Sequence, residues 1–415
     1  MDGDNTVSTS NNSRSGIIAI LFLTLHVVMI DRMMTNFLGP FLVTGLHLDA
    51  SQIGFAAGAT GACWAISALV FGAVSDRVGR RKVLIPAVFL FSAFSWLSGV
   101  ATSFDQFLLC RALLGLTEGP CFAVLMALVE ETSRTDRRAR NMGIVNSAGP
   151  LAAGITPVLA TWLALGMGWR WGFFGAAIPG FVMGVLVLLF VPEPVRAAAP
   201  APAGRGAGVA TLLANRQLWL CLLGAFGFVV SLMAFIVFAP LYMTQVMHQD
   251  PNTAGVLMSA AGFGGAAWAF FGTGLADRIG RRAALMLFSA LNATSIALFL
   301  VPAMYGAPIL LGVLAFVLSA GPASAALVLA VIPAEVVPRS HVAAAIGFAG
   351  IGAETFGGSL GPAAGGMLAQ SFGLAAPVVL AVAGAVVVFV VALLLRETRP
   401  APDAAPPAAE RGLAA

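Results

Sequence analysis

Long apolar stretches alternate along the chain with short segments that carry most of the charged residues. A window of about 19 residues delimits twelve such stretches, at 17–43, 51–74, 83–102, 104–129, 141–165, 170–191, 216–243, 252–275, 283–303, 306–332, 342–368 and 374–395. Most exceed the roughly 20 residues that an α-helix needs to cross the hydrocarbon core of a bilayer. The pattern therefore predicts an all-α membrane protein with twelve transmembrane helices.

The polar segments divide these helices into two sets of six. Residues 192–214 follow the sixth stretch and are rich in Pro, Ala and Gly, which is typical of a linker. We therefore expect two six-helix bundles, at 17–191 and 215–396, joined by a cytoplasmic linker. Residues 1–16 and 397–415 are expected to be disordered cytoplasmic ends. No small-residue cleavage site follows the first stretch, which predicts that it stays in place as a membrane anchor.

The composition and charge agree with this topology. Of the 415 residues, 59% are hydrophobic and 10% are charged. With both termini cytoplasmic, every Lys and Arg except Arg32, Arg111 and Arg170 falls in or beside an inside segment. This is the positive-inside bias, and it predicts a multi-pass protein of the inner (plasma) membrane. It also accounts for the net charge of +4, so the charge does not indicate a nucleic-acid partner.

One short string occurs twice. SDRVGRR at 75–81 returns as ADRIGRR at 276–282, an offset of 201 residues, and each copy follows the second apolar stretch of its half. Such self-similarity predicts a duplicated architecture.

The longer string GAVSDRVGRR resembles the signature loop between spans 2 and 3 of the major facilitator superfamily, and the resemblance extends over residues 17–396. It implies two bundles, alternating access, and an inside latch that holds the halves together in the outward-facing state. The implied latch residues are Gly72, Asp76, Arg77, Gly79 and Arg80, with acids at the end of span 4 (Glu130, Glu131), and Asp277 and Arg278 in the second copy. That copy has Thr273 where the first has Gly72. A solvated basic loop is the alternative.

Five charged residues lie deep inside apolar stretches: Asp31, Arg32, Arg111, Glu118 and Glu354. A central Asp, Lys or Arg costs roughly 2.5 to 3.5 kcal/mol on insertion scales, so these residues should not face lipid. At about 1.5 Å per residue, the three acids fall near the middle of the bilayer. Arg111 and Glu118 are two helical turns apart on one face. A shared interior site is expected.

Fully ionised, these five residues carry one net negative charge. An organic anion bound between Arg32 and Arg111, with Asp31, Glu118 or Glu354 taking protons, would couple the two movements electrostatically. Two structural alternatives stay open. Arg111 and Glu118 could form a fixed salt bridge that orders the bundle, and Glu354, within GAETFGGSLGPAAGG, could serve a local gap in the backbone.

The Asp-Arg pair in span 1, together with RALLGLTEG at 111–119, resembles the anion:cation symporter branch, which includes proton-coupled sugar-acid transporters. The resemblance implies that Asp31 and Glu118 are protonation sites and that Arg32 faces a substrate carboxylate. Some members carry a second substrate-binding Arg in span 7. Residues 222–243 contain none, which argues against dicarboxylate substrates. Further polar residues that could line the cavity, or only pack between helices, are Asn146, Asn292, Trp64, His26 and Tyr242.

Several other functions lack their motifs. Lys82 is the only lysine, and no Walker A string is present, so ATP hydrolysis is not expected. No HExxH, GxSxG or CxxC pattern occurs, and the four cysteines lie in predicted spans. We therefore expect neither an enzyme nor a cofactor or metal, and the protein is expected to be monomeric.

The sequence thus favours proton-coupled uptake of a small organic anion, such as a sugar acid, by alternating access. A proton-coupled drug or metabolite exporter is the main alternative, because NSAGPLAAG at 146–154 resembles the Gly-Pro motif in span 5 of antiporters, with Ala153 in place of a second Gly. A membrane sensor with a transporter-like body is a third possibility, disfavoured because no soluble signalling domain is evident.

Overall fold

The computed structural model describes residues 11–193, 212–338 and 341–399. Helices of the N-terminal half are α1 (Asn11–Phe37), α2 (Gly39–Gly45), α3 (Ala50–Val78), α4 (Arg80–Val100), α5 (Phe104–Thr132), α6 (Arg138–Asn146), α7 (Ala148–Met167) and α8 (Arg170–Phe190). Those of the C-terminal half are α10 (Arg216–Gln245), α11 (Pro251–Ile279), α12 (Arg281–Ala297), α13 (Pro308–Leu318), α14 (Gly321–Ala326), α15 (Ile332–Glu335), α16 (Val342–Gly352), α17 (Gly358–Phe372) and α18 (Ala375–Leu394). Short 3₁₀ turns lie at Leu298–Leu300 and Pro302–Met304, and π turns at Leu327–Val331 and Ala353–Gly357. The fold is all-α, as predicted.

Eleven helical stretches in the described residues are long and apolar enough to cross a membrane. The twelfth predicted span, 342–368, corresponds to α16, the π turn Ala353–Gly357 and α17 in succession. The first span breaks at Leu38, before α2, where the pattern predicted one helix over 17–43. Pro40 in the first turn of α2 explains the break, because proline suits a helix start and not a helix interior.

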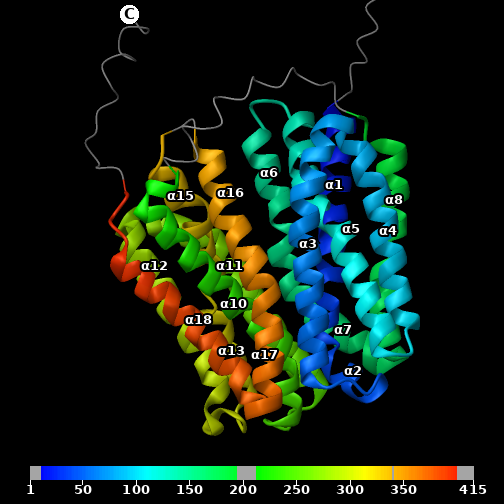
Figure 1. Ribbon diagram of the computed structural model, residues 1–415, viewed down its shortest axis with the longest axis vertical. Helices are drawn as coiled ribbons and strands as arrows, with labels where there is room; N and C mark the ends of the chain where they lie inside the picture. The colour runs from blue at the N-terminus through cyan, green and yellow to red at the C-terminus, as the bar shows by residue number, and fades with distance from the viewer. Residues whose placement is uncertain (1–10, 194–211, 339–340, 400–415) are drawn as a thin grey trace, which may run out of the picture.

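The two halves form separate groups of helices in Figure 1, blue to green for α1–α8 and green to red for α10–α18. We call the side where α1 begins the proximal side and the side of α2 the distal side. The most extensive contacts between the halves are those of α3 with α17 and of α7 with α11, and α10 also packs against α1 and α2.

Glycines make this contact close. A Cβ atom added to Gly58 would lie 2.6 Å from the carbonyl oxygen of Ser359, and one added to Gly61 would lie 2.5 Å from that of Gly358. A Cβ atom added to Gly255 of α11 would likewise lie 2.6 Å from the hydroxyl oxygen of Thr161 in α7. Small residues allow helix backbones to approach in this way. All of these contacts lie between the distal ends and the middle of the helices.

The halves separate toward the proximal side. The proximal segment α6 packs against α1, α5 and α7 of its own half, and α16 packs against α10 and α15 of its own half. The glycines Gly143 of α6 and Gly347 and Gly350 of α16 have no neighbouring atom within 4 Å of an added Cβ. The structure is therefore closed distally and open proximally.

The duplication also includes a distal turn, which the repeated string SDRVGRR/ADRIGRR did not reveal. His47 and His248 are separated by the same offset of 201 residues, and they are the two non-glycine residues with positive φ in the described chain, at 55° and 52°. Two residues later, Asp49 and Asp250 cap the N-termini of α3 and α11. Hydrogen bonds from Thr253 hold the pKa of Asp250 below its usual value. The two halves thus share a turn and cap as well as a loop.

Candidate functional site

A cross-half ion pair lies where the halves begin to separate. The guanidinium of Arg32 in α1 lies 3.3 Å from Glu354 Oε2, contributed by the other half. The same guanidinium stacks over the ring of Trp64 in α3, at 4.3 Å from the ring centre. The side chains of Arg32 and Glu354 are 17% and 32% exposed. Both side chains are therefore accessible to solvent, unlike those of a sealed salt bridge.

The backbone around Glu354 explains how its carboxylate reaches Arg32. Glu354 is the second residue of the π turn Ala353–Gly357, between α16 and α17. Single π turns inside α-helices occur often at functional sites, because the extra residue changes the direction of the following side chains. Gly357 allows the turn to pack closely against α10, because a Cβ atom added there would lie 2.9 Å from Val229. The turn thus separates α17, which packs against α3 of the other half, from α16, which packs against α10 and α15 of its own half.

A second group of charges is sealed inside the N-terminal half. Asp31 accepts a hydrogen bond of 2.6 Å from Ser95 in α4. Arg111 of α5 lies over the ring of Phe173 at 5.6 Å, and both Arg111 and Glu118 are close enough to act on the Asp31 carboxylate. Asp31, Arg111 and Glu118 are at most 1% exposed. We call these three residues the buried triad.

The buried triad is not a fully paired network. No ion pair within 4.0 Å joins Arg111 to Glu118 or Asp31 among the residues that the structure describes. In this part of the chain, the three guanidinium nitrogens of Arg111 and both carboxylate oxygens of Glu118 have no hydrogen-bond partner. Buried polar atoms normally have partners. The fixed Arg111–Glu118 salt bridge, considered from the sequence, is therefore not present in this conformation.

Adjacent positions in α1 separate the two groups of charges. Successive helical residues point about 100° apart, so Asp31 faces α4 and α5 while Arg32 faces Trp64 and the other half. One helix turn thereby supplies an acid to the sealed interior and a base to the opening between the halves.

The other predicted binding residues lie elsewhere. Asn146 is an exposed residue at the end of α6, and Asn292 packs against Gly321 of α14. Neither joins the hydrogen bonds or ion pairs of Arg32, Glu354 or the buried triad within the described residues. His26 contacts the carbonyl of Ala148 at 2.9 Å, and the hydroxyls of Tyr242 and Tyr305 are 2.5 Å apart. Of the weaker candidates, the structure brings Trp64 alone to the charged residues.

Sequence reasoning missed Ser95 and Phe173, which contact Asp31 and Arg111. A lone serine or phenylalanine in an apolar stretch gives no local signal. Their role depends on which helices meet, so pattern alone could not identify them.

The first repeated loop forms a compact ionic cluster within its own half. Arg80 lies 2.5 Å from Asp76 and 3.3 Å from Glu131, and it donates to the hydroxyl of Ser75. The predicted partner Glu130 pairs with Arg138 instead, at 3.4 Å. Gly79 has φ of 128°, which favours glycine. The side chain of Arg77 has no ion pair, and no hydrogen bond or ion pair joins a predicted latch residue to the other half, within the described residues.

The second copy repeats the arrangement. Arg281 pairs with Asp277 and lies 2.9 Å from Glu335, and the carbonyl of Arg278 accepts a hydrogen bond from Arg399. Glu397 accepts hydrogen bonds from the backbone N–H groups of Arg281 and its neighbour, at the start of α12.

The bound segment corrects the predicted chain ends. The sequence placed 397–415 in a disordered tail, but residues 397–399 are fixed to this loop, and α1 begins at Asn11, inside the predicted N-terminal end. The rest of both ends and most of the linker lie outside the described residues. Partial burial works to raise the pKa of Glu397, but the backbone hydrogen bonds outweigh it and hold the pKa below the usual value.

The comparisons with known proteins now identify the class. The model of the Major Facilitator Superfamily matches residues 21–310 and 231–415. The chain belongs to this superfamily. A solved structure with the same fold is a bacterial homologue of the human lysosomal transporter Spinster, inward-facing and unoccupied. Its TM-score is 0.78 at 20% identity, over 95% of this chain and 100% of that chain.

The curated relatives have names that indicate different roles. The chain is 30% identical to the hexuronate transporter of Bacillus subtilis over 43% of its own length and 42% of the relative's. It is 30% identical to a probable 4-methylmuconolactone transporter of Cupriavidus pinatubonensis over 62% of both chains. It is 26% identical to the multidrug resistance protein MdtL of Escherichia coli over 60% of its length and 62% of the relative's. These matches span less than two thirds of each relative.

Proposed function

We propose that this transporter takes up a small organic anion together with protons, and that Arg32 binds the carboxylate of the anion. The cross-half pair between Arg32 and Glu354 carries the proposal. It presents a guanidinium to the opening between the halves, at a depth where a charge is not expected without a function.

Substrate binding would exchange one carboxylate for another. Glu354 is the one ionic partner of Arg32 among the described residues, and both side chains are partly exposed. An entering anion can replace Glu354 at Arg32, because a guanidinium binds a carboxylate through two parallel hydrogen bonds. The ring of Trp64 would then cover one face of the bound molecule. The released Glu354 would no longer join the π turn Ala353–Gly357 to α1, so anion binding would be linked to movement of the halves.

The buried triad would supply the proton site. It contains two acids and one base, and it is sealed from solvent. A single proton bound by Asp31 or Glu118 brings its net charge to zero, and a charge in a low-dielectric interior is expensive unless it is paired. Because Asp31 precedes Arg32 in α1, protonation and anion binding act on the same helical turn. This linkage is the basis for symport.

The direction of the opening follows from the distribution of basic residues. The loops after α3 and α11 and the segment before α6 hold the arginines of the proximal side, which makes this side cytoplasmic by the positive-inside rule. The termini would then be cytoplasmic, the membrane the plasma membrane, and the conformation inward-facing. In the outward-facing state the two repeated loops would approach each other and form the latch.

The relatives support an acid as substrate. A further relative is a probable L-galactonate transporter of Escherichia coli, which is 26% identical over 59% of this chain. Hexuronate and L-galactonate are both sugar acids. Export remains the second candidate, supported by the similarity to MdtL and by the NSAGPLAAG string. In the structure this string spans the junction of α6 and α7, and Ala153 and Gly154 meet Gly262 and Phe263 of α11.

Transport into proteoliposomes distinguishes the two. The purified protein is reconstituted in vesicles with an imposed pH gradient, and uptake of radiolabelled hexuronates, galactonate and aromatic acids is measured against efflux of lipophilic cations. We expect anion accumulation in the direction of proton flow, collapsed by a protonophore. Accumulation that needs opposite proton flow, or movement of cations alone, would overturn the proposal in favour of export.

A further inference from the structure

A pocket of about 360 Å³ lies on the proximal side of the N-terminal half, away from the cross-half pair and the buried triad. It is bounded by the first turns of α1, the end of α5 and the start of α6. Its volume is within the roughly 300 to 1,000 Å³ of known small-molecule sites. Its lining includes Ser15, Ile18, Phe22, Arg137, Arg140 and Ile144. No step of the proposed transport uses it.

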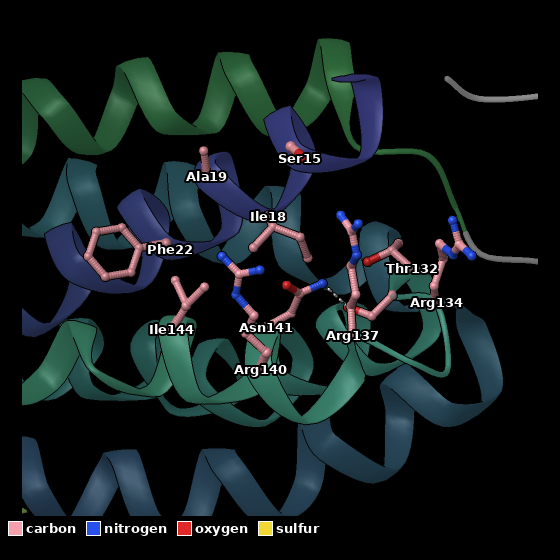
Figure 2. A pocket seen from close by; sticks show the side chains of 11 residues that line it. Ser15, Ile18, Ala19, Phe22, Thr132, Arg134, Arg137, Arg140, Asn141 and Ile144 are labelled. Atoms are coloured by element: carbon pink, nitrogen blue, oxygen red, sulfur yellow. Dashed lines mark hydrogen bonds between the residues drawn. The ribbon is translucent and has the colours of Figure 1, made fainter. Parts of the chain in front are cut away.

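The pocket is basic at one end and apolar at the other. Figure 2 shows Arg134 and Arg137 at one end and Phe22 with Ile144 at the other, and the side chains of Arg137 and Arg140 extend toward α1. Such a lining complements a molecule with an anionic head and an apolar tail. A small inorganic anion would contact the basic end alone.

The charges at the basic end are not neutralised locally. Arg134 and Arg137 share Asp136, at 3.2 and 3.9 Å, whereas Arg140 has no ion pair or hydrogen bond within the described residues. Near Arg140, Asn141 donates to the hydroxyl of Ser133 at 2.9 Å, as the dashed line in Figure 2 marks. The site therefore carries excess positive charge beside hydroxyl and amide groups, which together suit phosphate oxygens.

The depth of the pocket matches a phospholipid. Ser15 is the first residue of the membrane-spanning part of α1, and Phe22 lies seven residues further along. At about 1.5 Å per residue this places Phe22 roughly 10 Å deeper in the membrane. By depth along α1, the basic end would thus lie at the level of lipid headgroups and the apolar end at the level of the acyl chains. In addition, α6 packs mainly against α1, α5 and α7 of its own half.

We propose that this pocket binds one anionic phospholipid of the proximal leaflet, with its phosphate at Arg137 and Arg140 and an acyl chain along Ile18, Phe22 and Ile144. The inference is independent of the transported substrate. General attraction of basic loops to acidic membranes would involve all exposed arginines equally, whereas a built site gives Arg140 a specific role.

The test is lipid binding by native mass spectrometry. Delipidated wild-type protein in detergent is titrated with dioleoyl phosphatidylglycerol, dioleoyl phosphatidylcholine or inorganic phosphate. We expect preferential retention of one phosphatidylglycerol, and about fivefold weaker binding by Arg140→Gln, the effect of removing one basic residue near an anionic lipid. Arg140→Lys should keep most of the affinity, and phosphate should not displace the lipid.

Arg396→Gln is the matched control, because Arg396 is exposed at the end of α18 and its side chain has no ion pair within the described residues. Equal loss in Arg396→Gln and Arg140→Gln would show diffuse attraction and overturn the proposal. Ile144→Ser tests the apolar end. It should weaken phosphatidylglycerol binding, and an unchanged affinity, or displacement of lipid by phosphate, would indicate a site for small anions instead.

Discussion

The two halves share a fold and a repeated loop but differ in the charge of their interiors. The N-terminal half holds four charged residues near the middle of its helices, Asp31, Arg32, Arg111 and Glu118, whereas the C-terminal half holds Glu354. In the C-terminal half, α10 contributes apolar and aromatic residues instead. The deep ionisable groups are thus concentrated in one half, and the other half contributes a single counter-charge. We infer that the N-terminal half binds and couples, while the C-terminal half moves against it.

The largest effect is expected for Arg32→Ala. It removes the guanidinium that we assign to the substrate, and loss of a close charge pair corresponds to ~2 kcal/mol or more. Anion uptake, measured as initial rate in proteoliposomes, should fall at least about 30-fold. Arg32→Lys should retain part of the activity, and Asn292→Ala, which changes a residue packed against Gly321, should match wild type. Substantial uptake by Arg32→Ala would contradict the assignment.

Glu118→Gln tests the coupling role of the N-terminal half. Without an ionisable group at this position, a pH gradient should no longer drive accumulation, while exchange of labelled for unlabelled anion across the vesicle membrane should continue. Asp31→Asn serves as the companion variant. Retention of full proton-driven accumulation in both variants would place the coupling site elsewhere.

Glu354→Gln tests the contribution of the C-terminal half. The Arg32–Glu354 pair is partly exposed, and such pairs contribute up to about 1 kcal/mol. Removing the competing carboxylate should therefore lower the apparent KM for the anion by up to about fivefold. A raised KM would mean that Glu354 assists binding instead of competing with the substrate.

The smallest effect concerns the bound C-terminal segment. Glu397→Gln weakens the cap on α12, which we expect to lower stability by ~0.5–2 kcal/mol and the apparent Tm in detergent by about 2 °C. In the N-terminal half, Glu193 lies beside Gly79 without a hydrogen bond among the described residues. Glu193→Gln is thus the matched control and should change Tm less. Equal decreases in Tm for Glu397→Gln and Glu193→Gln would contradict a specific capping role of Glu397.

The same variant has a defined pH dependence. Because the folded-state pKa of Glu397 is lowered, its contribution is complete above the unfolded-state value of about 4.3 and is lost as the pH falls through the folded-state pKa. The Tm difference between wild type and Glu397→Gln should be constant from about pH 8 to pH 5 and disappear in stronger acid. A difference that grows on acidification would exclude the capping role.

Most of the fold was predictable because hydrophobic length and the positive-inside bias are local signals. The membrane stretches, the repeated loop and the presence of five deep charges all follow from them. The proximity of Asp31 to Glu118 and Arg111 was also expected, from depth alone. The break at Leu38 was not, because a continuous apolar run does not reveal a helix that restarts at proline.

The pairing of Arg32 with Glu354 could not be predicted from the chain. These residues are 322 positions apart, and their contact depends on how the two halves stand in this conformation. The choice of Glu131 over Glu130 by Arg80 likewise depends on the rotation of α5 at its last turn. Sequence patterns specify faces and depths of helices, and rigid-body placement decides the partners.

The position of the π turn at Glu354 has a mechanical consequence. The turn lies between α17, which packs against the other half, and α16, which packs only within its own half among the strong contacts, so the ion pair is close to the point where the two halves separate. From Glu354 to the start of α16 is about 18 Å at 1.5 Å per residue. A rotation that only just separates the 3.3 Å pair therefore sweeps the end of α16 through a much larger arc. We therefore expect that replacement of Glu354 by a substrate carboxylate at Arg32 would change the width of the opening between the halves.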